Sequence, residues 1–160
     1  MVKSLRRMAN DMRPQILNDM DIAVAIQRCA REFEKRTGIR CRVKISAKHH
    51  ILDQPRAIAV LRIFQEALSN VQRHSGANRV DIAWTQGSKG LSLKVYDNGK
   101  GIRQRDLRHT ESLGIIGMRE RALLCGGKLE ISRKGNSGTS LSAYIPLRTR
   151  QQNPNENPHR

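Results

Sequence analysis

The stretch that decides the fold is Arg62-Ile-Phe-Gln-Glu-Ala-Leu-Ser-Asn-Val-Gln-Arg-His-Ser75. It predicts the second half of an amphipathic helix, because apolar residues recur there at steps of three and four. These apolar positions are Ala57, Val60, Leu61, Phe64, Ala67, Leu68 and Val71. Glu66, Asn70 and His74 recur every fourth residue on another side, and each such step turns the helix by about 40°. The resulting polar stripe is able to hold a hydrated metal ion and handle protons, or it is simply a solvated face.

The composition limits the class of protein. The chain has 160 residues, of which 38 % are hydrophobic and 28 % are charged, which suits one compact, soluble domain. Its formal net charge of +16 indicates a negatively charged partner, which would be a nucleic acid, an acidic membrane surface or a phosphate-rich ligand. Aromatic residues make up only 3 % and the basic residues are scattered, so stacking on single strands is disfavoured. We therefore expect no nucleic acid among the partners.

The cysteines and the apolar runs bear on the compartment. Cys29, Cys41 and Cys125 are odd in number and lack the spacing of a metal site, so we expect reduced thiols in the cytoplasm. No apolar run approaches the roughly 20 residues of a membrane span. The first residues, Met-Val-Lys-Ser-Leu-Arg-Arg, lack the apolar core of a signal peptide. Any membrane anchor of the native protein is expected outside this chain.

Periodicity and turn residues predict an α/β order for the rest of the chain. A first helix begins at Asp19 or Asp21 and ends at Gly38. Strands are predicted at 41–46, 80–84, 91–95, 129–131 and 141–145, a charged loop at 102–113 and a short helix at 118–124. Runs of strands with alternating faces favour a mixed, mostly antiparallel sheet that is covered on one face by helices.

Glycine clusters follow the polar stripe along the chain. They are Asp97-x-Gly99-x-Gly101, Gly114-x-x-Gly117 and Gly138-Thr139. Asp97 ends a predicted buried strand, where an ionised carboxylate suits an exocyclic amine such as the adenine N6, in a bond worth roughly 1.5–3 kcal/mol. Gly117 precedes the predicted short helix, whose first amide groups are free to bind phosphate. Taken singly, the clusters also suit an ordinary turn, helix start or hairpin loop.

The ordered set of motifs is more specific than its parts. Glu66-x-x-x-Asn70, Asp97-x-Gly99-x-Gly101, Gly114-Ile-Ile-Gly-Met-Arg-Glu-Arg121 and Gly138-Thr139 together resemble the ATP-binding domain of the sensor histidine kinases of two-component systems. The match looks closest to the subfamily of the nitrate sensors. It covers about residues 5–147 and includes Arg13-Pro14 upstream. The resemblance implies the Bergerat fold, a two-layer α/β sandwich, with ATP and Mg²⁺ as ligands.

The resemblance also implies a role for each site residue. Asn70 would coordinate the Mg²⁺ that bridges the ATP phosphates, which suits an amide oxygen. Glu66 would be the base or hydrogen-bond partner of the attacking imidazole, and His74 would lie near the phosphates or have a structural role. Asp97 would bind adenine, supported through water by Thr139. The other nucleotide contacts that it implies are Gly99 and Gly101 around adenine, Gly114 and Gly117 beside the phosphates, and Met118.

The function that the resemblance implies is transfer of the ATP γ-phosphoryl to a histidine on a dimerisation domain absent from this chain. That domain would pass it to a response regulator, and the full-length protein would be a homodimer whose kinase part is cytoplasmic. Residues 1–18 would end a dimerisation helix and linker, 19–147 form the ATP-binding catalytic domain, and 148–160 form a disordered basic tail. Glu111-Ser112-Leu113 stands where relatives often carry His or Gly, which leaves the lid contacts open.

Two alternatives stay open at this stage. The same fold would serve a serine kinase of the anti-sigma type or a plain ATPase, although Arg13-Pro14 and Gly-Met-Arg-Glu-Arg speak against both. A basic module that binds DNA or acidic lipid without catalysis is a different class. Steep salt dependence of DNA binding without nucleotide binding would favour this module, whereas the retention of Glu66, Asn70 and Asp97 speaks for an enzyme.

Overall fold

The structure, a computed structural model, describes residues 21–46, 52–103, 113–135 and 137–147. The elements along the chain are α2 (Ile22–Thr37), β1 (Arg40–Ile45), α3 (Gln54–Asn70), the π-helical turn η2 (Val71–Ser75), β2 (Arg79–Gln86), β3 (Gly90–Asp97), α5 (Leu113–Leu124), β4 (Lys128–Arg133) and β5 (Thr139–Pro146). The linker and tail predicted at 1–18 and 148–160 lie outside the described residues.

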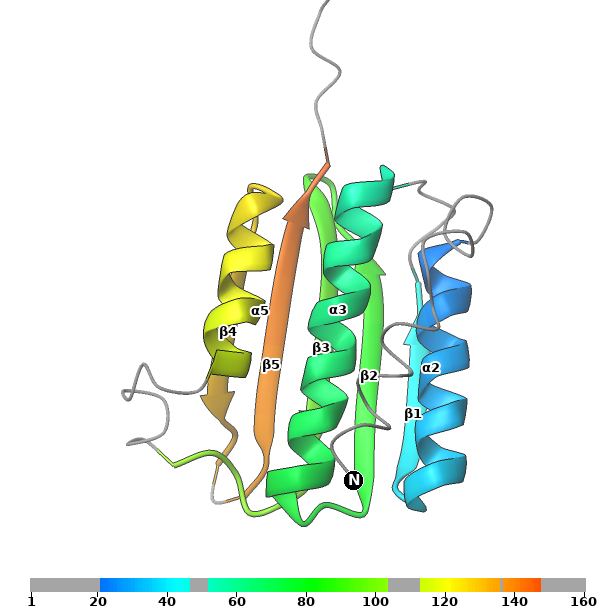
Figure 1. Ribbon diagram of the computed structural model, residues 1–160, viewed down its shortest axis with the longest axis vertical. Helices are drawn as coiled ribbons and strands as arrows, with labels where there is room; N and C mark the ends of the chain where they lie inside the picture. The colour runs from blue at the N-terminus through cyan, green and yellow to red at the C-terminus, as the bar shows by residue number, and fades with distance from the viewer. Residues whose placement is uncertain (1–20, 47–51, 104–112, 136, 148–160) are drawn as a thin grey trace, which may run out of the picture.

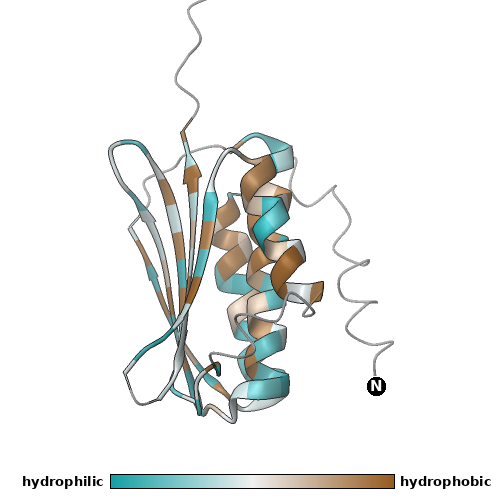
Figure 2. Cartoon of the chain, turned by 90° about the vertical axis from the view of Figure 1, so that its left-hand side faces the viewer, coloured by the Kyte–Doolittle hydropathy of each residue, from teal (hydrophilic) through white to brown (hydrophobic). Residues whose placement is uncertain are grey.

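The strands form one five-stranded sheet in the order β1-β2-β3-β5-β4. β1 pairs in parallel with β2, and the other neighbours pair antiparallel. Helices α2, α3 and α5 lie side by side on one face of this sheet (Figure 1). The view from the side shows the sheet and the helices as two layers (Figure 2). The predicted mixed sheet with helices on one face is therefore confirmed.

The hydrophobic core fills the space between the two layers. All seven positions predicted for the apolar face of α3 are buried, and Phe64 among them is completely inaccessible to solvent. Alternate residues of β2, Val80, Ile82 and Trp84, are buried against the helices. No helix in the described part of the chain has both the length and the apolar character needed to cross a bilayer.

The ends of the first two helices follow the sequence signals. Asp21 is the N-cap of α2, and its Oδ1 accepts a hydrogen bond of 3.0 Å from the backbone N–H of Ala23. Asp53 caps α3 in the same way, through the N–H of Arg56. Gly38 ends α2 in the left-handed conformation, as predicted, with φ of 74°.

Two helix boundaries differ from the prediction. The last turn of the central helix, Val71–Ser75, is π-helical, and the Ser75 hydroxyl donates a 2.7 Å hydrogen bond to the Val71 carbonyl. Helix α5 begins at Leu113 instead of residue 118. Gly117 therefore lies inside a helix, which the structure describes from Leu113 onward. The prediction that Gly117 precedes the helix was wrong.

A backbone contact joins the end of the central helix to the loop after β3. The carbonyl of Ser75 accepts a hydrogen bond of 2.9 Å from the N–H of Lys100. A Cβ atom at Gly99 would overlap this same carbonyl oxygen and lie 2.8 Å from the Ser75 carbonyl carbon. Glycine at position 99 is thus required for the two backbones to approach, and the contact holds Asp97 close to the helix end.

The substitution Gly99→Ala should lower the free energy of unfolding by about 1–3 kcal/mol, because the new methyl group has to push two backbone segments apart. Urea unfolding followed by circular dichroism measures this change. Gly87→Ala is the matched control, since a Cβ there meets only the Gly90 carbonyl at an ordinary 3.7 Å. Equal stabilities of the two variants would contradict the role given to Gly99.

Candidate functional site

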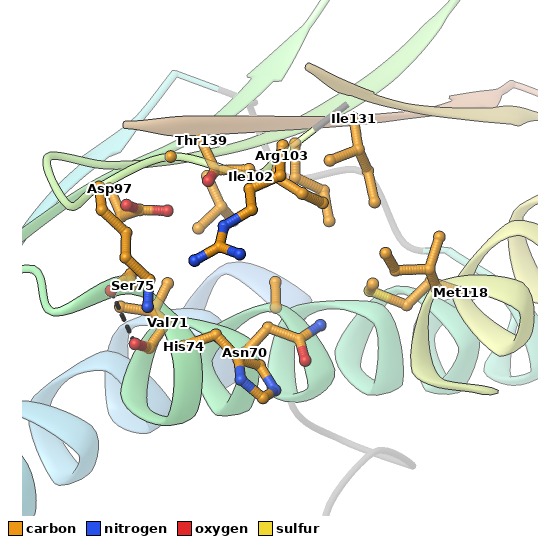
Figure 3. A pocket seen from close by; sticks show the side chains of 16 residues that line it. Asn70, Val71, His74, Ser75, Asp97, Ile102, Arg103, Met118, Ile131 and Thr139 are labelled. Atoms are coloured by element: carbon orange, nitrogen blue, oxygen red, sulfur yellow. Dashed lines mark hydrogen bonds between the residues drawn. The ribbon is translucent and has the colours of Figure 1, made fainter. Parts of the chain in front are cut away.

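A cavity of about 690 Å³ lies between the end of the central helix, the sheet and α5. Its size is in the range of small-molecule and cofactor sites. The side chains that line it are drawn in Figure 3. They belong to Ala67, Asn70, Val71, His74, Ser75, Val95, Asp97, Lys100, Gly101, Ile102, Arg103, Ile115, Met118, Ile131, Thr139 and Leu141.

Asp97 is the polar group buried deepest in this lining. It ends β3, is only 3 % exposed, and its Oδ1 accepts a 2.9 Å hydrogen bond from the N–H of Gly99. Burial raises the pKa of Asp97, and hydrogen bonds from Gly99 and Thr139 partly offset this rise. Thr139 lies opposite Asp97 in the β3–β5 pairing, and the water predicted between the two side chains stays a prediction.

The helix end supplies polar groups to the other side of the cavity. Asn70 and His74 lie one turn apart on the helix that lines the cavity opposite Asp97 and Thr139, and the imidazole of His74 points away from those two residues in Figure 3. Asn70 is partly buried, whereas His74 is exposed. Glu66, the third member of the predicted stripe, does not line the cavity. Two residues of the predicted stripe, Asn70 and His74, therefore line the cavity, whereas Glu66 lies against Gly114 of α5.

Lys100 and Arg103 are cavity residues that the sequence analysis did not identify. The guanidinium of Arg103 extends into the space between Asp97 and the helix end (Figure 3). Both follow Asp97 within the segment Asp97-Asn-Gly-Lys-Gly-Ile-Arg103, so basic residues interleaved with the glycines were the available signal. Both residues are exposed, so they form a cationic mouth of the cavity, which suits an anionic group.

Apolar side chains form the middle of the cavity. Ile102, Ile115, Met118 and Ile131 all line it, and of these only Met118 was predicted as a site residue. Met118 and Ile131 lie at the end away from Asp97 in Figure 3. In the sequence such residues cannot be told from the core, because they follow the same periodicity. An apolar cleft with one buried acceptor and a cationic mouth suits a flat, amine-bearing ring that carries phosphates.

The predicted glycines differ in their relation to the cavity. Gly101 lines it, with φ of 77°, a conformation that favours glycine. Gly99, Gly114 and Gly117 are not among the lining residues. Gly99 contacts Ser75, and the space of a Cβ at Gly114 is taken by the Glu66 carboxylate. At Gly117 that space is occupied by the end of the Arg121 side chain.

Comparison with known proteins agrees with this geometry. The family model described as "Histidine kinase-, DNA gyrase B-, and HSP90-like ATPase" matches residues 56–149, which hold all of the cavity lining. The chain belongs to this ATPase family. The recognition made from the motifs is thereby confirmed, while the subfamily of the nitrate sensors stays a prediction.

Relatives within the ATPase family are named as kinases. The chain is 32 % identical over 155 residues to the signal transduction histidine-protein kinase/phosphatase DegS of Brevibacillus brevis, covering 94 % of this chain and 40 % of that protein. It is 31 % identical over 147 residues to the sensor histidine kinase MctS of Rhizobium johnstonii, covering 91 % and 32 %. The chain thus spans well under half the length of these relatives.

Solved structures show the same fold. The histidine kinase domain of the blue-light activated histidine kinase of Erythrobacter litoralis EL346 superposes with a TM-score of 0.68 at 23 % identity. The match covers 80 % of this chain and 62 % of that one. At this identity the likeness supports the fold of the ATPase family alone.

The raised pKa of Asp97 makes stability depend on pH. The folded state holds this proton more tightly than the unfolded state, so the favourable contribution is full below the ordinary pKa of 3.8 and is lost as pH rises through the folded-state value. The variant Asp97→Asn has a neutral side chain at every pH, so its stability should not fall in this way as pH rises. Urea unfolding from pH 4 to 8 should therefore show the variant gaining stability relative to the wild type as pH rises. A pH-independent difference would contradict the assignment.

Proposed function

We propose that this chain is the ATP-binding catalytic part of a sensor histidine kinase, which transfers the γ-phosphoryl of ATP to a histidine on a separate dimerisation domain. The observation that carries the proposal is the buried Asp97 carboxylate, which faces a cavity of nucleotide size in a chain of this ATPase family. The kinase names of the relatives support the reaction.

Adenine binding is proposed for the end of the cavity at Asp97. An ionised carboxylate accepts but does not donate hydrogen bonds, so it favours the exocyclic amine of adenine. Thr139 fixes its orientation, and Gly101 and Met118 form nearby walls of the same cavity. Gly99 acts on this site through the backbone, because it allows the loop after β3 to approach Ser75.

Phosphate binding is proposed for the helix end and the cationic mouth. Asn70, a cavity residue, would provide the protein oxygen for Mg²⁺. The described residues contain no group of three or more His, Cys, Asp and Glu side chains able to hold a metal, which suits an ion held by few protein oxygens. When bound, Mg²⁺ neutralises charge on the phosphates. His74, Lys100 and Arg103 lie at the same cavity and add hydrogen-bond donors.

The first turn of α5 is proposed to flank the phosphates. Gly114 lies in the first turn of α5 as the structure describes it, and amide groups at the start of a helix are able to bind phosphate. Gly117, one turn later, gives the end of the Arg121 side chain room against the helix. Such a set of donors positions the phosphoryl group and neutralises its charge, which is most of what phosphoryl transfer requires.

Glu66 is proposed as the base or hydrogen-bond partner of the acceptor imidazole. Its carboxylate lies against Gly114 in this structure and is not in the cavity lining. The side chain therefore has to leave Gly114 before it acts on an acceptor. The proton that the imidazole loses on phosphorylation would then pass to this carboxylate.

The partners proposed are the histidine-bearing dimerisation domain of the same kinase and, through it, a response regulator. The full-length protein would be a homodimer whose kinase part works in the cytoplasm. Within the described residues Cys29, Cys41 and Cys125 form no disulfide bond, which suits a reducing compartment.

Mixing the chain with Mg-ATP labelled at the γ position and a separate histidine-bearing dimerisation domain tests the reaction. Label should appear on that domain as an acid-labile, base-stable phosphohistidine. Asn70→Ala should reduce the rate at least about a hundredfold, in the range expected for loss of electrostatic stabilisation. The control Gln72→Ala, exposed on the next turn, should not. Acid-stable label, or release of free phosphate alone, would contradict a histidine kinase.

A further inference from the structure

Glu66 is seated on the first turn of a neighbouring helix. A Cβ atom built on Gly114 of α5 would overlap Oε1 of Glu66 and lie 3.1 Å from its Cδ and 3.5 Å from its Cγ. The carboxylate thus occupies the space that any larger residue at position 114 needs. A side chain at position 114 would therefore require the Glu66 side chain to shift from this place between α3 and α5.

The charge of Glu66 fits this position as well as its shape. Helix α5 begins at Leu113 within the described residues, so Gly114 belongs to its first turn. Backbone N–H groups in a first turn have no partners within the helix and carry partial positive charge, which favours a carboxylate nearby. Glu66 is partly buried there, so solvent screens this attraction only in part.

The seat of Glu66 lies directly beside the cavity wall. Ile115, next to Gly114, and Met118, one turn further, both line the cavity from α5. Asn70, one turn beyond Glu66 on α3, lines it from the opposite side. The contact between Glu66 and Gly114 therefore lies between the two helices that line the cavity.

We propose that Glu66 is a positioning residue: its carboxylate, seated on Gly114, holds the first turn of α5 and thereby sets the cavity wall formed by Ile115 and Met118. This role is additional to the transfer of a proton. Its consequence for nucleotide affinity rests on the function proposed above, whereas its consequence for stability does not. On this proposal, residue 114 is glycine because the Glu66 carboxylate occupies the space that a side chain there would need.

A double-mutant cycle tests the contact without nucleotide. Gly→Ala inside a helix normally raises the folding equilibrium constant about fivefold. Gly114→Ala should instead lower it at least about fivefold in the wild type, because the methyl group meets Glu66. In the Glu66→Ala background the space is open, so the same change should raise it. A change of the same sign and size in both backgrounds would overturn the proposal.

Gly117→Ala is the stability control on the same helix. A Cβ there lies 2.8 Å from the end of the Arg121 side chain, which is exposed and free to rotate away. This variant should therefore raise the folding equilibrium constant by a similar factor with Glu66 present or replaced. A reversal of sign at position 117 as well would mean that α5 responds to Glu66 in general, and the specific seat at Gly114 would be overturned.

Calorimetric titration with Mg-ATP tests the positioning of the wall. Gly114→Ala and Glu66→Ala should each weaken binding about tenfold or more, while Glu66→Gln, which keeps the shape, should stay nearer to the wild type. Unchanged affinity in Gly114→Ala and Glu66→Ala would overturn the positioning role. If the wild type itself bound no Mg-ATP, the proposed function would fail, and the stability cycle would still decide the contact.

Discussion

The candidate site depends on one backbone contact, between the end of the central helix and the loop that follows β3. The N–H of Lys100 donates to the Ser75 carbonyl, and the absence of a side chain at Gly99 lets the two segments approach. Because Asp97 immediately precedes this loop, the contact places a buried carboxylate across a cavity from Asn70. A π-helical last turn carries Ser75 to the contact, and such turns are frequent at functional sites.

The cavity built on this contact combines two kinds of chemistry. One part of its lining is apolar and includes Met118 and Ile131. The other part contains the buried Asp97 carboxylate, whose pKa is raised because burial disfavours its charge, together with Asn70 and the exposed cations Lys100 and Arg103. A ligand with a flat base at one end and phosphates at the other matches both parts. Lys100 and Arg103 contribute to the chain's excess positive charge, and at this cavity both suit a phosphate-bearing ligand.

Much of the fold was predictable from the sequence because periodicity reports burial. The apolar face of α3, the alternation in the strands and the caps Asp21 and Gly38 all follow local rules. The start of α5 was missed since Gly114 and Gly117 were interpreted as loop and helix boundary, although both lie within the helix. The π-helical turn was not predicted, because apolar periodicity does not distinguish such a turn from an α-helical one.

The site was predictable in its polar members and much less so in its geometry. Asn70, Asp97 and Thr139 lie at the cavity because motif spacing encodes them, whereas Glu66 turns to Gly114 through the packing of two helices. Lys100 stood within the glycine motif and Arg103 in the predicted charged loop at 102–113, and neither was identified as a cavity residue. The group that a polar side chain on a helix contacts depends on tertiary packing, which the local sequence does not encode.

The central claim is that Asp97 accepts a hydrogen bond from the exocyclic amine of adenine. The most direct measurement compares, by calorimetry on the wild-type chain, the affinities of Mg-ATP and the Mg²⁺ complex of purine riboside triphosphate, which lacks only that amine. A charge-assisted hydrogen bond of roughly 1.5–3 kcal/mol predicts that the analogue binds about 10- to 150-fold more weakly. Equal affinities for the two nucleotides would contradict the account.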